Sequence, residues 1–251
     1  MTIRSKTIDW ESYSTQYDLL ARNNPSYQDN IEALRVMLPQ WNLPRSASVC
    51  DLGAGTGNYI CSIAKDIPEA SFVHVDADPQ MNAVARAKYK REGVKNVSLV
   101  TSTIGETEFD NDSFDLIICV NALYAMDSRE AVFAKIHSWL KKDGIFFVID
   151  FGRQTNLFDW GRYIFGNMYR KEGIGACLRF VKNGFETIRQ NRKGSKGQAS
   201  GNYWLHSTDE FDRTLSEHGF RVELLRTCYR GYCDLAVCRL NTPNPPHSPS
   251  L

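Results

Sequence analysis

A glycine-rich stretch between two apolar runs constrains the fold of this chain more than any other feature. Residues 49–52 (VCDL) form a short, mostly apolar run, and three glycines, Gly53, Gly55 and Gly57, follow it at alternate positions. Glycine permits positive φ angles, and it lets a ligand approach the backbone more closely than a Cβ would allow. The pattern therefore predicts a β-strand, a tight turn and the beginning of a helix.

An acidic residue lies where a second strand of the same unit is expected to end. Residues 71–75 form another apolar run, and Asp76 follows it directly. An acid about 20 residues after a glycine-rich turn can accept hydrogen bonds from both hydroxyls of a ribose. The glycines and Asp76 together predict an α/β domain that binds a nucleoside.

The chain after the first strand alternates apolar runs with amphipathic stretches. Strands are predicted at 49–52, 71–75, 97–101, 114–121, 145–150, 220–228 and 232–240, and helices at 59–65, 79–91, 129–140 and 208–218. The helix at 129–140 is expected to end at residues 141–144 (KKDG), because glycine favours helix C-termini. Repeated β–α units build a parallel sheet with right-handed crossovers.

Two segments lie outside this alternation. Residues 1–44 are expected to form a cap of two helices, and residues 152–206 an insertion after the fifth strand; the helices are predicted at 11–23, 27–38, 157–169 and 174–190. Residues 192–201 have no apolar side chain larger than alanine, which predicts a mobile loop. The proline-rich residues 241–251 are expected to be disordered, so residues 1–240 are predicted to form a single domain.

Charge and cysteine usage restrict the possible partners. Thirty Lys and Arg against 29 Asp and Glu leave a net charge of +1, so neither nucleic acid nor a membrane is an expected partner. Seven cysteines without a C-x-x-C pair are typical of reduced thiols in a cytoplasmic protein. No apolar run reaches about 18 residues, and the pattern contains no metal-binding motif, so neither a membrane span nor a metal is predicted.

Three of these runs resemble the motifs of class I S-adenosylmethionine (SAM)-dependent methyltransferases. Residues 51–57 (DLGAGTG) are similar to the first motif, residues 75–81 (VDADPQM) to the second, and residues 112–118 (DSFDLII) to the run into the fourth strand. The NAD fingerprint, in contrast, requires the spacing G-x-G-x-x-G. The resemblance is good over residues 45–150. It implies a Rossmann-like sheet of seven strands, mostly parallel with an antiparallel C-terminal hairpin strand, and helices on both faces.

The resemblance implies SAM as cofactor, S-adenosylhomocysteine as product and a set of cofactor-binding residues. Gly53 and Gly55 would approach the methionine and ribose parts, Asp76 would bind the ribose, and Asp51 would hold the turn or meet the amino group. The other expected contacts are Ala77 and Met81 at the adenine, Thr103 and Ile104 where the family often has an acid and a small residue, Asn121 at the methionine part, and Tyr17 in the cap.

The acceptor side is less strongly indicated. Tyr124 stands where many members of the family carry a histidine that faces the substrate, and it is either catalytic or structural. His206 follows Tyr203 near the insertion and is a candidate general base. Tyr13 and Tyr203 are candidate substrate contacts, although the N-terminal aromatics could instead cover the sheet. The NPPY run of enzymes that methylate nucleobases or glutamine amides is missing.

Three functions remain open from the sequence. The first is direct in-line methyl transfer to a small molecule, such as a specialised metabolite, which needs proximity more than acid–base help because the leaving group is neutral. The alternative is an enzyme of the same fold that transfers or cyclises the aminobutyrate arm of SAM and releases methylthioadenosine. The third is a SAM-binding module without activity. The sequence does not predict the oligomeric state.

Overall fold

The computed structural model describes residues 10–126 and 128–241, and these fold around one sheet of seven strands. The order across the sheet is β3 (Val97–Thr101), β2 (Ser71–Asp76), β1 (Ser48–Leu52), β4 (Phe114–Val120), β5 (Leu140–Phe151), β7 (Cys233–Leu240) and β6 (Phe220–Cys228). Strand β7 runs antiparallel to both neighbours, and the pairs among β1 to β5 are parallel. The predicted seven-stranded sheet is therefore confirmed.

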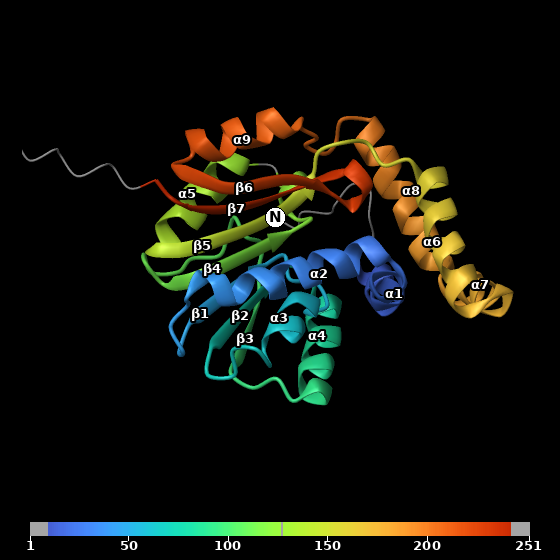
Figure 1. The fold of residues 1–251 in the computed structure, drawn as a ribbon, viewed down its shortest axis with the longest axis horizontal. Helices are drawn as coiled ribbons and strands as arrows, with labels where there is room; N and C mark the ends of the chain where they lie inside the picture. The colour runs from blue at the N-terminus through green and yellow to red at the C-terminus, as the bar shows by residue number, and fades with distance from the viewer. Residues whose placement is uncertain (1–9, 127, 242–251) are drawn as a thin grey trace, which may run out of the picture.

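Helices cover both faces of the sheet (Figure 1). Helices α2 (Pro25–Met37), α3 (Asn58–Ile63) and α4 (Pro79–Glu92) pack on one face, and α5 (Arg129–Trp139) and α9 (Thr208–Glu217) on the other. Strand β5 supplies both cores, because Phe147 and Ile149 face the first set of helices while Phe146 and Val148 face the second. Such a strand, buried on both faces, explains the continuous apolar run in the sequence.

The strand order reverses between β1 and β4. Strand β1 pairs with β2 on one side and with β4 on the other, so the chain leaves these strands in opposite directions. In open α/β sheets, ligands bind in the crevice outside the carboxyl ends of the strands at such a reversal. The glycines after β1 and the acid at the end of β2 both lie at this edge.

Four helices gather beyond this carboxyl edge (Figure 1). They are α1 (Trp10–Asn23), which precedes the sheet, and α6 (Leu157–Glu172), α7 (Ile174–Asn183) and α8 (Phe185–Ala199) from the insertion. The insertion has its own small apolar core, formed by Ile164, Met168, Ala176, Cys177 and Phe180. Leu19 and Leu20 of α1 pack against that core, so the N-terminal helix and the insertion meet above the sheet edge.

Two predictions for the insertion are wrong. Residues 192–201 are not a loop, because α8 continues to Ala199, and the helix predicted at 174–190 is divided at Gly184. Polar side chains of α8 have partners that the sequence pattern does not reveal: Gln198 Oε1 accepts the backbone N–H of Thr155 at 2.9 Å, and Ser195 Oγ donates to the Thr155 carbonyl at 3.2 Å. These tertiary hydrogen bonds hold a polar sequence in a helix.

The fifth strand begins earlier than predicted. Residues 141–144 belong to β5 rather than ending the preceding helix, and Leu140 pairs with Phe114 of β4. Lys141 Nζ lies 2.8 Å from Asp115 Oδ2 of the same neighbouring strand, and this ion pair stabilises the charged side chain within the strand. The predictions for residues 1–9 and 242–251 fall outside the described residues.

Candidate cofactor and acceptor site

The glycine turn is joined directly to the end of β2. The N–H groups of Gly53 and Ala54 both donate to the carbonyl of Val75, at 2.9 and 3.0 Å, and the φ angles of Gly53, Gly55 and Gly57 are +68°, +55° and +75°. A Cβ at Gly53 would lie 2.5 Å from the Cβ of Ala122, whereas a Cβ at Gly55 would meet no atom within 4 Å. The turn therefore has open space over Gly55, where a ligand can approach the backbone.

The carboxylate of Asp76 holds this turn in place. Its Oδ2 accepts the N–H of Gly55 at 2.8 Å, and its Oδ1 accepts the N–H of Asp78 at 2.9 Å. Burial raises the pKa of Asp76, and the two backbone hydrogen bonds oppose that shift. Each carboxylate oxygen has a second lone pair, so Asp76 keeps acceptor capacity for a ligand's hydroxyl groups.

A buried polar relay supports the end of β2. Asn82 Nδ2 donates to the carbonyl of Asp76 at 3.0 Å and to Thr101 Oγ1 at 2.9 Å, which leaves its Oδ1 to accept from His74 Nε2 at 2.8 Å. His74 Nδ1 then accepts from the hydroxyl of Tyr89 at 2.8 Å. Burial lowers the pKa of His74 to about 4, so the ring is neutral. The sequence indicated a core histidine here but not this relay.

Asp51 has a buried oxygen without a partner. Its side chain is 2% exposed, and Oδ2 has no hydrogen-bond partner among the described residues. Burial, followed by the charge of Asp76, raises the pKa of Asp51 to about 8. The hydroxyls of Tyr59 and Tyr229 are likewise buried without a partner in the described chain. This part of the edge therefore offers polar atoms that the protein itself does not satisfy.

Four tyrosines line the edge beside Asp51. The ring of Tyr27 lies 6.4 Å from that of Tyr17, 5.9 Å from that of Tyr59 and 6.4 Å from that of Tyr229. Tyr229 adopts a φ of +45°. A positive φ is unusual for a residue with a bulky side chain. Aromatic faces next to a carboxylate suit a cationic group.

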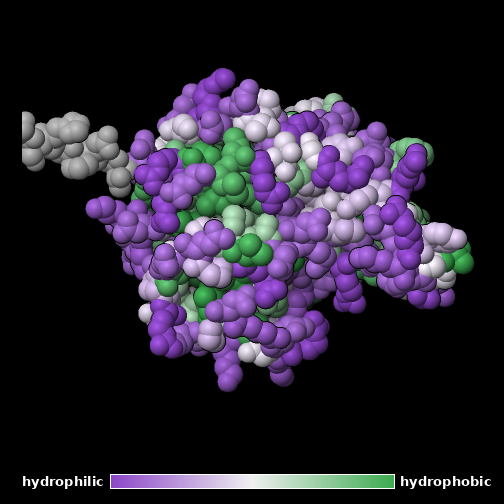
Figure 2. Space-filling model, in the orientation of Figure 1, coloured by the Kyte–Doolittle hydropathy of each residue, from purple (hydrophilic) through white to green (hydrophobic). Residues whose placement is uncertain are grey.

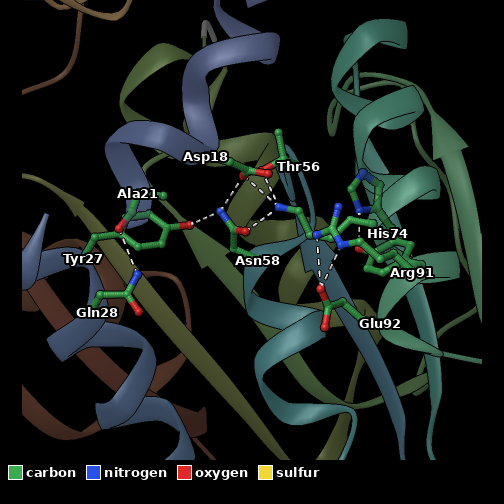
Figure 3. A network of polar contacts seen from close by, with 11 residues as sticks. Asp18, Ala21, Tyr27, Gln28, Thr56, Asn58, His74, Arg91 and Glu92 are labelled. Atoms are coloured by element: carbon green, nitrogen blue, oxygen red, sulfur yellow. Dashed lines mark hydrogen bonds and ion pairs between the residues drawn. The ribbon is translucent and has the colours of Figure 1, made fainter. Parts of the chain in front are cut away.

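Helix α1 is fastened to the glycine turn by an ion pair (Figure 3). Lys88 Nζ lies 2.7 Å from Asp18 Oδ1 and 3.1 Å from Thr56 Oγ1, and Thr56 Oγ1 donates to the same Asp18 oxygen at 2.6 Å. Asn58 joins the network by accepting from Lys88 and donating to Tyr27. Burial lowers the pKa of Lys88, and Asp18 opposes the shift. Sequence reasoning did not identify this network.

The residues expected at the adenine occupy different environments. Ala77 is exposed, and Met81 is buried on α4, whose first turn is capped by Asp78. Ile104 packs in the apolar core beneath the sheet edge. Thr103 Oγ1 donates to Glu106 Oε2 at 2.9 Å and accepts the Glu106 N–H at 3.2 Å, so its hydroxyl stabilises a local turn. Roles for these four residues remain predictions.

A second group of predicted residues meets beyond β4 and β5. Asn121 adopts a φ of +52°, and its N–H donates to the Ile149 carbonyl at 2.7 Å. The ring of Tyr124 packs edge-to-face on Phe151 and on Tyr203, both with centroids 4.9 Å away. The structure thus brings Tyr124 and Tyr203 together, and their roles remain predictions.

His206 lies next to this aromatic pair and forms a buried pair with Asp234. Its backbone N–H donates to the carbonyl of Gly152 at 3.1 Å, and its Nδ1 lies 3.3 Å from the Ser207 carbonyl and 3.4 Å from Asp234 Oδ2. The imidazole stacks on Phe211 at 4.4 Å, and Nε2 has no partner in the described chain. A histidine held at one nitrogen by a carboxylate, with the other nitrogen unbonded, has the arrangement of a general base.

Asp234 is itself held by three side chains. Arg153 Nη1 donates to its Oδ2 at 2.6 Å, and Thr208 Oγ1 donates to its Oδ1 at 2.8 Å. Burial would raise the pKa of Asp234, but the hydrogen bonds from His206, Arg153 and Thr208 outweigh it and lower the pKa. A Cβ at Gly152 would lie 2.6 Å from Asp234 Oδ2, so glycine is required there.

Asp150 is a further buried acid at this edge. It pairs with Asp234 across β5 and β7, and neither of its carboxylate oxygens has a hydrogen-bond partner among the residues described. Burial raises its pKa well above the usual range, and the backbone N–H groups of Tyr124 and Phe151, followed by the charge of Arg129, oppose the shift. Arg129 itself lies over the ring of Trp204 at 4.8 Å.

One predicted site residue falls outside the described part of the structure. Tyr13 lies in α1, but its side chain is outside the described part of the structure. Within the described ranges, no group of three or more His, Cys, Asp or Glu side chains could hold a metal ion. None of the helices in those ranges is both long and apolar enough to cross a membrane.

Comparison with known proteins finds similarity to methyltransferases over part of the chain. Residues 49–144 match the family model described as "Methyltransferase domain". The chain is 32% identical over 120 residues to the uncharacterized methyltransferase YcgJ of Bacillus subtilis, covering 47% of this chain and 46% of that protein. It is 30% identical over 135 residues to a carboxy-S-adenosyl-L-methionine synthase of Campylobacter jejuni, covering 51% and 54%. The chain thus spans about half the length of these curated relatives.

Solved structures agree with the fold. The methyltransferase in complex with the Trm112 activator of Haloferax volcanii aligns with a TM-score of 0.64 and 14% identity, over 96% of this chain and all of that one. A SAM-dependent methyltransferase of Aquifex aeolicus aligns with a TM-score of 0.56 and 15% identity, over 82% and 88%. Residues 49–144 therefore resemble a methyltransferase domain, and the described chain shares the fold of these solved structures.

Proposed function

We propose that the protein is a SAM-dependent methyltransferase that acts on a small-molecule acceptor by direct in-line methyl transfer. The observation that carries the proposal is the open space over Gly55 beside the carboxylate of Asp76. In this proposal residues 1–44 cap the site and residues 152–206 act as its lid, within one domain spanning residues 1–240. The dense aromatic lining at the edge favours an enclosed pocket rather than a groove for a polymer.

The chain's polar atoms fit this cofactor. Asp76 would bind the ribose hydroxyls, and Gly55 would let the backbone approach them. The unpartnered Oδ2 of Asp51 beside the tyrosine rings suits the cationic methionine part. Further contacts are assigned by the resemblance to Tyr17, Gly53, Ala77, Met81, Thr103, Ile104 and Asn121. When bound, SAM supplies a methyl group on a positively charged sulfonium.

The acceptor would bind between the tyrosines and the histidine. Tyr124 and Tyr203, with Tyr13 from α1, would form walls that orient it. His206 Nε2 would accept the proton of the acceptor's hydroxyl or amine, and Asp234 would keep the imidazole oriented and stabilise its positive charge. The burial of His206 would exclude water from that proton transfer.

The competing function is chemistry on SAM itself, in which the enzyme transfers or cyclises the aminobutyrate arm and releases methylthioadenosine. It is favoured by the match to a carboxy-S-adenosyl-L-methionine synthase, whose name describes a modified SAM as the product. In that reading the cluster of Tyr17, Tyr27, Tyr59 and Tyr229 would enclose the reacting arm of SAM.

The products of SAM turnover distinguish these functions. The purified protein is incubated with SAM alone and with a panel of small phenols and amines, and the nucleosides are identified by mass spectrometry. S-adenosylhomocysteine that forms only with an acceptor supports the methyltransferase. If methylthioadenosine or a new SAM derivative forms when no acceptor is added, the competing function would replace the methyltransferase proposal. Tight SAM binding without any turnover would contradict both and indicate a binding module.

A further inference from the structure

Helix α7 exposes a row of apolar side chains to solvent. Ile174, Leu178, Val181 and Phe185 are 63%, 65%, 48% and 68% exposed. Ile174, Leu178 and Val181 are spaced four and three residues apart, which places them on one side of α7, and Phe185 begins α8 after a single glycine. We call these four residues the α7 stripe.

The stripe is additional to the face that packs inside the protein. Ala176, Cys177 and Phe180 of the same helix are buried in the small core of the insertion. Helix α7 therefore has one apolar face that serves the fold and a second that nothing in the described chain covers. The neighbouring Tyr169 at the end of α6 is also exposed, at 60%. Contiguous exposed apolar surface usually marks an interaction site.

The stripe lies at the outer end of the molecule. In Figure 1, α7 is the element of the insertion farthest from the sheet, and Figure 2 shows a small hydrophobic area among hydrophilic side chains at the same end. A flat surface could reach α7 there without contacting the sheet. The candidate cofactor site lies on the sheet side of the insertion, so the stripe is separate from it.

The insertion is strongly basic. Residues 157–199 contain nine Lys and Arg against three Asp and Glu, a net charge of +6, whereas the whole chain carries +1. The rest of the chain therefore has a net charge of −5, and the overall balance conceals two regions of opposite sign. Arg170, Lys171, Arg179 and Lys182, all exposed, lie on the helices that carry Tyr169 and the stripe. An anionic partner would meet both charge and apolar surface here.

We propose that the α7 stripe and the basic residues around it dock the protein on the surface of an anionic lipid bilayer. An interfacial helix inserts an apolar face to a shallow depth while Lys and Arg contact the negative headgroups. A single row of four side chains suits that mode. A stable protein–protein interface, in contrast, buries about 800 Å² on each partner.

Co-sedimentation with lipid vesicles tests this docking. The full chain is mixed with vesicles of phosphatidylcholine alone and of phosphatidylcholine with phosphatidylglycerol in a 7:3 ratio, a proportion of roughly physiological order for anionic lipid. We expect at least tenfold stronger partitioning to the anionic vesicles, reduced by high salt because the Debye length shortens. Equal partitioning to both vesicles, or none to either, would overturn the proposal.

Two matched pairs of variants locate the contact. Leu178→Asp should weaken partitioning at least tenfold, and its control is Val36→Asp on α2, where the original side chain is also exposed, at 56%. R179Q/K182Q should weaken it by roughly fivefold per charge, and its control is K90Q/R91Q on α4. All four original side chains of these two double variants are exposed, so folding should survive.

The same variants exclude the main competing explanation. If the stripe were instead an interface between two copies of the chain, sedimentation velocity of the free protein would show a dimer that Leu178→Asp dissociates. A dimer of this kind would contradict the proposal. So would equal vesicle binding by Leu178→Asp and Val36→Asp.

Discussion

The two halves of the carboxyl edge are built in different ways. The half at β1 and β2 is held by backbone N–H groups that bond segments close in sequence, such as Gly53 N to the Val75 carbonyl and Gly55 N to Asp76 Oδ2. The half at β4, β5 and β7 is held by side chains that are far apart in the chain, such as Arg153 and Asp234. We refer to them as the cofactor half and the acceptor half.

This difference concerns what each half can recognise. Backbone N–H groups and one carboxylate define a fixed shape for a cofactor that every member of a family shares. The acceptor half is built from side chains that meet only in the folded protein, and Nε2 of His206 has no partner there among the described residues, just as Asp51 Oδ2 has none in the cofactor half. Buried polar atoms without partners cost stability, so their retention points to a function in ligand binding or catalysis.

The largest expected effect of a substitution is on the acceptor half. His206→Asn should lower the rate of methyl transfer by roughly 10²–10⁴-fold, the usual contribution of a general base, while SAM affinity stays unchanged. Rates come from S-adenosylhomocysteine release and affinity from calorimetry. A His206→Asn protein with a normal rate would show that proximity alone suffices and would remove the catalytic role of His206.

The cofactor half should respond to Asp76→Ala by losing affinity. Removing a hydrogen-bonded carboxylate should weaken SAM binding by about 1–3 kcal/mol, as measured by calorimetry. Asp78→Ala is the matched control, because it removes only the cap of α4, and its cost of about 1 kcal/mol should appear in unfolding rather than binding. Similar losses of affinity in both variants would contradict the ribose assignment.

Asp51 should make the folded protein less stable as pH rises. Its folded pKa of about 8 exceeds an unfolded value of about 3.9, so the folded state alone binds the proton between these values. Stability should therefore fall with rising pH across that window, by up to about 1.4 kcal/mol per pH unit. His74 acts in the opposite direction below about pH 6.5, because its folded pKa is about 4.

The effect of Asp51 is consequently clearest between about pH 6.5 and 8. Denaturant unfolding of the wild type should show a steeper decline there than Asp51→Asn, which cannot ionise. Parallel pH profiles for the two proteins would mean that Asp51 is already ionised in the folded state, stabilised by a group outside the described residues.

Two glycines with positive φ should give the smallest effects, and comparing them should distinguish a loss of stability from a loss of SAM binding. Gly55→Ala and Gly93→Ala both place a Cβ at positive φ, +55° and +70°, with no atom within 4 Å. Each should cost about 1 kcal/mol of stability. Only Gly55→Ala should also weaken SAM binding, because Gly93 lies at the far end of α4. Equal SAM affinity in both variants would place the cofactor elsewhere.

The cofactor half could be predicted from the sequence because its interactions are local. The turn at Gly53 to Gly57 and the acid at Asp76 are defined by residue type and by short spacing, and the structure places them at one edge. The partner of His206 could not be found in this way, because Asp234 lies on another strand and reaches it only after the hairpin has formed. The pairing of Asp150 with Asp234 depends on the same strand register.

The errors in the insertion have a related cause. Composition predicted a loop at 192–201, but Ser195 and Gln198 obtain partners at Thr155, some 40 residues earlier. The exposed stripe on α7 was also missed, because the sequence of an apolar helix does not reveal whether one or both of its apolar faces are buried. Net charge was averaged over the chain, which hid the basic insertion.

The ion pair beneath α1 makes the helical cap and the glycine turn one thermodynamic unit. Asp18 contacts Lys88 and Thr56 through the same oxygen, so α1 cannot leave without disturbing the turn. Linkage is reciprocal. If docked α1 raises a ligand's affinity by some factor, the bound ligand raises the equilibrium constant for docking of α1 by the same factor. If SAM binds at the turn, the N-terminal helix would act as an effector of cofactor binding that is part of the same chain.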